Sequence, residues 1–187
     1  MKIDPATGWC QGAQPCPSPN FNERPDGEVS LLVIHNISLP PGQFNTGCVQ
    51  QLFQNTLDSS AHPFFETIAE LRVSAHFLIE RDGTLIQFVS CLQRAWHAGV
   101  SSFEGRDTCN DFSIGIELEG TDFEPFTDEQ YQVLTALSRQ LLAQYPGITP
   151  SRICGHSDIA PVRKTDPGPH FDWARYRASL VANEGEQ

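Results

Sequence analysis

The chain has 187 residues, enough for one domain of ordinary size that buries a core without help from disulfides. Hydrophobic residues make up 39% of the sequence and include 12 Phe, which excludes a largely disordered protein. The formal net charge of −11 excludes long-range attraction to nucleic acid or anionic membranes, and it mildly favours a small soluble substrate over a large anionic polymer.

The N-terminal segment has no basic patch followed by an apolar stretch, so we expect no signal peptide and a cytosolic protein. The first predicted element is a buried strand over residues 30–37, rich in Leu, Val and Ile, with His35 near its carboxyl end. Its apolar run, 31–34, is far shorter than the roughly 20 residues of a membrane span. Short helices are predicted around residues 48–55 and 63–71.

The middle of the chain carries a hairpin signal. Residues 74–80 and 84–89 are β-rich and flank Asp82-Gly83, a dipeptide typical of two-residue hairpin turns. Residues 93–111, around Trp96-His97-Ala98-Gly99, contain many Gly, Ser, Asn and charged residues and predict a long ordered loop. Ordered loops of that length are uncommon in compact domains and are usually functional.

Residues 112–119 alternate between an apolar and a polar face and predict a strand that carries Glu117. A carboxylate on such a strand is costly to bury without a positive partner, so Glu117 is a candidate for a perturbed pKa. Thr127 to Gln130 resembles a capping box, and the apolar stripe that follows predicts a helix ending near Tyr145.

The C-terminal third predicts a short strand over 152–155 that leads to His156, then a loop constrained by three prolines. Asp172 can cap a last helix that runs to about Val181, and residues 183–187 are expected to be loose. The irregular alternation of strand and helix signals predicts an α+β (mixed α/β) fold, a central mixed β-sheet packed by helices. We expect one domain over 1–187, with its core at about 17–182.

The chain contains six cysteines, at positions 10, 16, 48, 91, 109 and 154. In a chain of this size without an export signal, cysteines are more often free thiols than disulfides. We therefore expect free thiols. Cys154 is two positions before His156 and is the thiol closest to a possible metal site, although we rank it behind Asp166 as a ligand.

His35, His156 and Asp166 supply two imidazoles and one carboxylate, the ligands of a hydrolytic zinc centre with an open fourth position. Their spacing matches no short zinc signature, and a lone histidine at a strand end is more often a hydrogen-bonded structural residue. Four other histidines remain alternatives. We expect His76 to be packed within a strand. His62 and His170 neighbour proline and are expected in loops, and His97 is expected in the substrate loop.

A hydrolytic zinc site also needs a group that takes a proton from water and a donor that stabilises an oxyanion. Glu117 and Lys164 suit those two roles. The alternative is that the two form an ion pair or are solvated charges, and Lys164 in particular can be a surface residue.

Several motifs together resemble the N-acetylmuramoyl-L-alanine amidases, and in particular the branch that acts on 1,6-anhydro-muropeptides in cytosolic peptidoglycan recycling. The motifs span most of the chain: Val33–Ser38, Arg72–Phe77, Ala95–Gly99, Asn110–Gly120, Gly155–Pro161 and Arg163–Pro169. The resemblance implies the fold shared with peptidoglycan recognition proteins and phage T7 lysozyme. It also implies hydrolysis of the amide between the lactyl group of anhydro-muramic acid and L-Ala of the stem peptide.

Residue by residue, the resemblance implies one Zn²⁺ held by His35, His156 and Asp166, with Glu117 and Lys164 as catalytic residues. The substrate contacts that we expect are Asn36, Arg72, Trp96, His97 and Arg106. Arg106 enters because Thr108 stands where some relatives carry a basic residue. The resemblance further implies an indirect effect on β-lactamase induction. We expect a monomer, and the net charge and the short apolar runs predict no nucleic-acid or membrane partner.

Two other functions compete with this hypothesis. A non-catalytic muropeptide-binding module needs neither a full ligand set nor Glu117 and Lys164, and this chain keeps all five residues. An amidase for the intact cell wall requires export. The sequence therefore favours a cytosolic zinc amidase.

Overall fold

The computed structural model describes residues 1–181, so the expected loose tail at 183–187 lies outside the described residues. Its strands are β1 Lys2–Ile3, β2 Cys10–Gln11, β3 Gln14–Pro15, β4 Phe21–Glu23, β5 Leu31–Ile37, β6 Phe77–Ile79, β7 Leu85–Gln87, β8 Gln93–Ala95, β9 Ser102–Phe103, β10 Arg106–Asp107, β11 Ser113–Glu119 and β12 Ile153–Gly155. Its helices are α1 Cys48–Phe53, α2 Pro63–Ile68, α3 Asp128–Gln144, α4 His156–Ile159 and α5 Trp173–Val181, with 3-10 turns η1 Ser59–Ala61, η2 Cys109–Asp111 and η3 Pro150–Arg152.

The main sheet has the strand order β12-β5-β11-β6-β7-β3. Strands β12, β5, β11 and β6 are mutually parallel, whereas β6 and β7 form the predicted antiparallel hairpin. The hairpin strands are shorter than the sequence indicated, and Gly83 takes the positive φ of the turn. The sheet is therefore mixed, as predicted.

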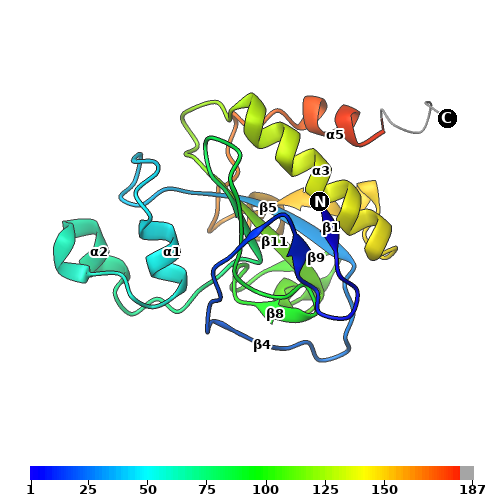
Figure 1. Ribbon diagram of the computed structural model, residues 1–187, viewed down its shortest axis with the longest axis horizontal. Helices are drawn as coiled ribbons and strands as arrows, with labels where there is room; N and C mark the ends of the chain where they lie inside the picture. The colour runs from blue at the N-terminus through cyan, green and yellow to red at the C-terminus, as the bar shows by residue number, and fades with distance from the viewer. Residues whose placement is uncertain (182–187) are drawn as a thin grey trace.

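Helices α3 and α5 pack side by side over one face of this sheet (Figure 1). Leu134, Leu137 and Leu141 of α3 are fully buried against apolar residues of β5, β6 and β11. The predicted capping box at Thr127 and Gln130 is present at the start of α3. Asp172 caps the start of α5 by accepting the Arg175 backbone N–H at 2.9 Å, as predicted.

The opposite face is covered at one end by α1 and α2, which lie together in Figure 1 away from α3. At the other end it is covered by residues 98–112 and by Ile159 of α4. Since side chains alternate along a strand, His35 of β5 and Glu117 of β11 point to this second face. The two residues are direct partners in the parallel register of β5 and β11.

Some sequence predictions need correction. All seven residues of β11 are buried, polar ones included, because a central parallel strand is covered on both faces. The loop predicted over 93–111 contains β8, β9, β10 and η2, since β8 pairs with the distant β4. His156 begins the one-turn helix α4 instead of a loop. All six cysteines are free within the described residues, as expected.

Candidate metal centre and active-site groove

The residues His35, His156 and Asp166 converge from three separate segments. His35 lies near the end of β5, His156 directly follows β12, and Asp166 lies in the loop after α4. The two Nδ1 atoms are 3.0 Å apart, and each is 3.1 Å from Asp166 Oδ2. Both histidines are buried, with exposed fractions of 0% and 3%.

This arrangement fits a single metal ion, because zinc ligands lie about 2.0–2.2 Å from the ion and therefore close to one another. Among the described residues, these three form a group able to hold a metal, and Cys154 is not part of it. The donor set of two imidazole nitrogens and one carboxylate oxygen is typical of a catalytic zinc site with an open position. The structure therefore supports Asp166 over Cys154.

The protonation states of the ligands also suit a metal. Burial lowers the pKa of His35 to about 4 although the Asp166 hydrogen bond opposes this shift, so the imidazole is neutral near pH 7. Burial alone would raise the pKa of Asp166, but the hydrogen bonds to His156 and His35 hold it well below its usual range. Neutral imidazoles and an ionised carboxylate are the forms that bind metals.

Glu117 lies beside this group and is almost fully buried, with 8% of its surface exposed. Burial, and next the negative charge of Asp166, raise the pKa of Glu117 well above its usual value, while Lys164 opposes the shift. Its Oε2 atom has no hydrogen-bond partner among the described residues. A buried carboxyl with a free oxygen at the edge of a groove can accept a proton from a reactant.

A groove of about 1180 Å³ opens over the metal group and Glu117. Lys164 lines it from the loop that carries Asp166. The apolar part of the lining comes from α1, α2 and the loops beside them, and from the segment after β11: Leu39, Pro41, Leu52, Phe53, Phe64, Ile68, Leu71 and Phe123. A groove that combines apolar walls with a few converging polar groups is the usual form of a small-molecule site.

Four of the five expected substrate contacts line this groove: Asn36, Arg72, Trp96 and His97. Asn36 donates to Asp122 Oδ1 at 2.7 Å, and Trp96 Nε1 donates to Asn22 Oδ1 at 2.7 Å. Arg72 bonds the carbonyls of Ala69 and Leu71 and keeps its side chain exposed.

Arg106 is placed elsewhere and does not belong to the groove lining. Its guanidinium pairs with Glu28 at 2.7 Å and lies 4.0 Å from the centre of the Phe112 ring. Thr108 lines an adjacent pocket of about 930 Å³ and has a positive φ of 61°. The geometry therefore gives no support to Arg106 as a substitute contact.

Of the remaining histidines, His62 and His76 have structural partners. His62 caps α2 by accepting the Phe64 N–H at 3.1 Å. His76 is buried and accepts the Gly115 N–H at 3.1 Å, as expected for a packed residue. His170 is exposed. Sequence reasoning did not anticipate that Arg163 lines the groove and donates to the carbonyls of Ala98 and Val100, although Arg163 begins the Arg163–Pro169 motif of the resemblance.

Comparison of the sequence with known proteins adds two findings. Residues 25–169 match the family model described as N-acetylmuramoyl-L-alanine amidase. The 1,6-anhydro-N-acetylmuramyl-L-alanine amidase AmpD of Escherichia coli K12 is 59% identical over 95% of this chain and 96% of its own length.

Among the described residues, no helix combines the length and apolarity of a membrane span.

Two solved structures extend the comparison. A crystal structure of a selenomethionine AmpD derivative superimposes with a TM-score of 0.93 at 56% identity, covering 97% of this chain and all of that one. A complex of the E. coli amidase AmiD with anhydro-N-acetylmuramic acid-L-Ala-D-γ-Glu-L-Lys gives a TM-score of 0.60 at 29% identity. That match covers 91% of this chain and 60% of the AmiD chain.

Proposed function

The chain belongs to the N-acetylmuramoyl-L-alanine amidase family, and from that premise we propose a zinc-dependent hydrolysis of 1,6-anhydro-muropeptides. The bond cleaved is the amide between the lactyl group of 1,6-anhydro-N-acetylmuramic acid and L-alanine of the stem peptide. The observation that carries the proposal is the meeting of His35, His156 and Asp166 beside the buried Glu117.

One zinc ion per chain would be held by His35 Nδ1, His156 Nδ1 and Asp166 Oδ2. When bound, zinc lowers the pKa of a water ligand and polarises a carbonyl. In hydrolysis, the oxygen of water joins the lactyl carbonyl carbon, the C–N bond breaks, and a proton reaches the departing amine of L-alanine.

Glu117 is the residue that we assign to proton transfer. Its raised pKa makes the ionised carboxylate a stronger base, which suits it to accept a proton from the attacking water. The same carboxylic acid can then give that proton to the amine of L-alanine. A single residue therefore serves both proton transfers, as the buried Oε2 without a partner among the described residues allows.

Lys164 is the residue that we assign to the negative charge that develops on the carbonyl oxygen. It lines the groove from the same loop as Asp166, and its positive charge lowers the pKa of Glu117. A cation aimed at a developing oxyanion contributes a large share of catalysis in acyl transfer.

Substrate selection is assigned to the walls of the groove. Arg72 and Asn36 offer polar groups to the peptide, and Trp96 and His97 line the same groove. We place the reaction in the cytoplasm, in peptidoglycan recycling by a monomeric enzyme, with the link to β-lactamase induction as an indirect consequence of muropeptide levels. The name of the AmpD relative and the AmiD complex support the choice of anhydro-muropeptide as substrate.

The test is incubation of the purified protein with anhydro-muramoyl tripeptide and identification of the products by mass spectrometry. We expect free tripeptide and anhydro-muramic acid with a free lactyl carboxylate. The His156→Ala variant should release neither product, and His170→Ala is the matched control because His170 is exposed. Binding of the muropeptide without cleavage by the zinc-loaded protein would contradict the proposal and favour the binding module.

A further inference from the structure

Both histidines of the metal group turn their second nitrogen toward one short segment, residues 97–98. His35 Nε2 lies 2.9 Å from Nδ1 of His97, and His156 Nε2 lies 3.1 Å from the carbonyl oxygen of Ala98. A neutral imidazole that gives Nδ1 to a metal carries its proton on Nε2. The Nε2–H of His35 therefore donates to His97, and that of His156 donates to Ala98.

The His97 ring has a partner on each side. Since Nδ1 accepts from His35, Nε2 carries the proton and donates to the Ser113 hydroxyl oxygen at 3.0 Å. The rings of His35 and His97 meet edge to face, with centroids 5.0 Å apart. The chain of donors from His35 through His97 to Ser113 permits one tautomer of each histidine.

Gly115 makes room for the His97 ring. A Cβ atom at position 115 would lie 2.5 Å from Cγ and Nδ1 of His97, closer than any real contact. Glycine in the middle of a strand is otherwise unfavourable, and it often marks a close approach of another group. The sheet surface is therefore hollowed at the point where this imidazole rests.

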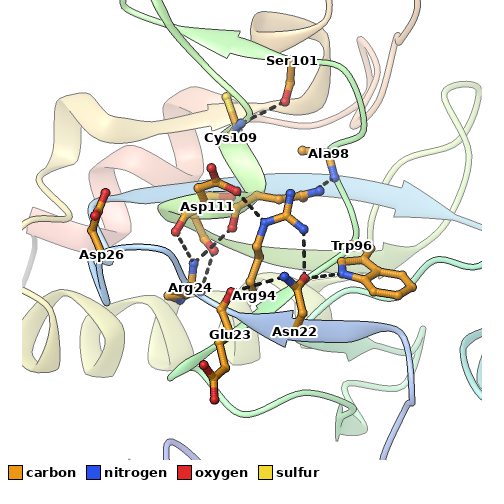
Figure 2. A network of polar contacts seen from close by, with 12 residues as sticks. Asn22, Glu23, Arg24, Asp26, Arg94, Trp96, Ala98, Ser101, Cys109 and Asp111 are labelled. Atoms are coloured by element: carbon orange, nitrogen blue, oxygen red, sulfur yellow. Dashed lines mark hydrogen bonds and ion pairs between the residues drawn. The ribbon is translucent and has the colours of Figure 1, made fainter.

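A buried polar network fixes the backbone of residues 97 and 98. Asn110 Oδ1 accepts the N–H of His97 at 3.1 Å and that of Ala98 at 2.8 Å. Arg24 in turn donates to the carbonyls of Asn110, Asp111 and Ser113 at 3.2, 3.1 and 2.8 Å. Figure 2 shows Arg24, Asp111 and Ala98 within this network.

We propose that His97 is a positioning residue of the zinc site, which holds the ring and the tautomer of His35 through the His35 Nε2–His97 Nδ1 hydrogen bond. This inference rests on the proposed function, because it concerns the affinity for zinc. Such outer partners orient a ligand and raise its basicity, and their loss typically costs 10–100-fold in metal affinity or activity. His97 also lines the groove, so the same residue borders the substrate site and contacts the metal ligand His35.

The test uses His97→Phe, which keeps a ring but removes both nitrogens, and His97→Gln, which keeps a hydrogen-bond acceptor. The exposed His170→Phe is the matched control. Zinc affinity is measured by competition with a chromophoric chelator, and the geometry of the site by the visible absorption of the Co²⁺-loaded protein. We expect His97→Phe to bind zinc about 10–100-fold more weakly with an altered Co²⁺ spectrum, and His97→Gln to recover part of that loss.

The outcomes separate the two proposals. A wild-type protein that binds no zinc at this site overturns both the proposed function and this inference. Tight zinc binding by the wild type, with the same affinity and Co²⁺ spectrum in His97→Phe, overturns the inference alone. If His97→Phe does not fold, Ser113→Ala replaces it, because it keeps the His97 ring and removes only the hydroxyl that His97 Nε2 bonds; a smaller loss of affinity is expected, and unchanged affinity overturns the inference.

Discussion

A methyl group added at Gly115 of β11 is expected to destabilise the protein through one neighbour, the His97 ring. The new Cβ would lie 2.5 Å from two atoms of that ring. Overpacking of this kind costs about 1–3 kcal/mol. Exchange of Gly for Ala in a strand by itself stabilises by about 0.5–1 kcal/mol, because Ala loses less conformational entropy on folding. We therefore expect Gly115→Ala to lower the free energy of unfolding by up to about 2.5 kcal/mol.

The strand cannot move to relieve this overlap. Gly115 is paired with Val33 of β5, and its carbonyl accepts the His76 N–H at 3.1 Å. The His97 ring must move instead, which breaks its hydrogen bonds to His35 and Ser113. The loss of stability should accordingly be accompanied by weaker metal binding.

The assay is urea denaturation of the metal-free protein in a double-mutant cycle with His97→Ala. Without the ring, Gly115→Ala should be neutral or stabilising by up to about 1 kcal/mol, so the two substitutions are coupled. An equal loss of stability with and without the His97 side chain would refute the argument, since it would mean that something other than this ring closes the space at Gly115.

Three further predictions follow from the buried polar groups. Glu117→Gln should lower hydrolysis about 10²–10⁴-fold without lowering the free energy of unfolding at pH 7, because burial disfavours the Glu117 charge; retained turnover would contradict the proton-transfer role. Arg24→Met should cost about 2–4 kcal/mol in urea denaturation, since the buried carbonyls that it bonds lose a charged donor. The control is Arg106→Met, which removes an exposed ion pair with Glu28 and should lower the free energy of unfolding by only about 0–1 kcal/mol. Equal losses in Arg24→Met and Arg106→Met would contradict this reasoning. Finally, burial lowers the pKa of His76 to about 3 and that of His35 to about 4, so protons bind these side chains more tightly in the unfolded chain. The stability that they contribute to the metal-free protein is full above about pH 6.5 and falls as pH drops, down to about pH 4 for His35 and about pH 3 for His76. The loss is about 2 kcal/mol per histidine at pH 5. The raised pKa of Glu117 offsets part of this loss. Urea denaturation across this pH range measures the effect, and no loss of stability between pH 6.5 and 5 in the Glu117→Gln background would contradict it.

Local signals in the sequence were sufficient for the elements that depend on neighbouring residues. The Asp82-Gly83 hairpin, the capping box at Thr127 and the apolar strand ending near His35 all have their cause within a few residues. Strands β1 to β4 were not anticipated, because each has only two or three residues and pairs with a partner distant in sequence or carries no local pattern.

The metal group was predictable only as a set of residue types. His35, His156 and Asp166 have the right chemistry, but what brings them together is the parallel order of β12, β5 and β11, which no short motif encodes. The place of His97 was harder still to predict. It depends on the absence of a side chain at Gly115 and on the Asn110 amide, so a residue expected in a substrate loop also contacts a metal ligand.

The most direct measurement is hydrolysis of anhydro-muramoyl tripeptide by one preparation before chelation, after chelation and after return of zinc, with the metal content determined at each stage. We expect cleavage at the lactyl–L-alanine amide that disappears with the metal and returns at one zinc per chain. Full cleavage by the metal-free protein, or zinc-dependent cleavage that survives unchanged in His156→Ala, would contradict it.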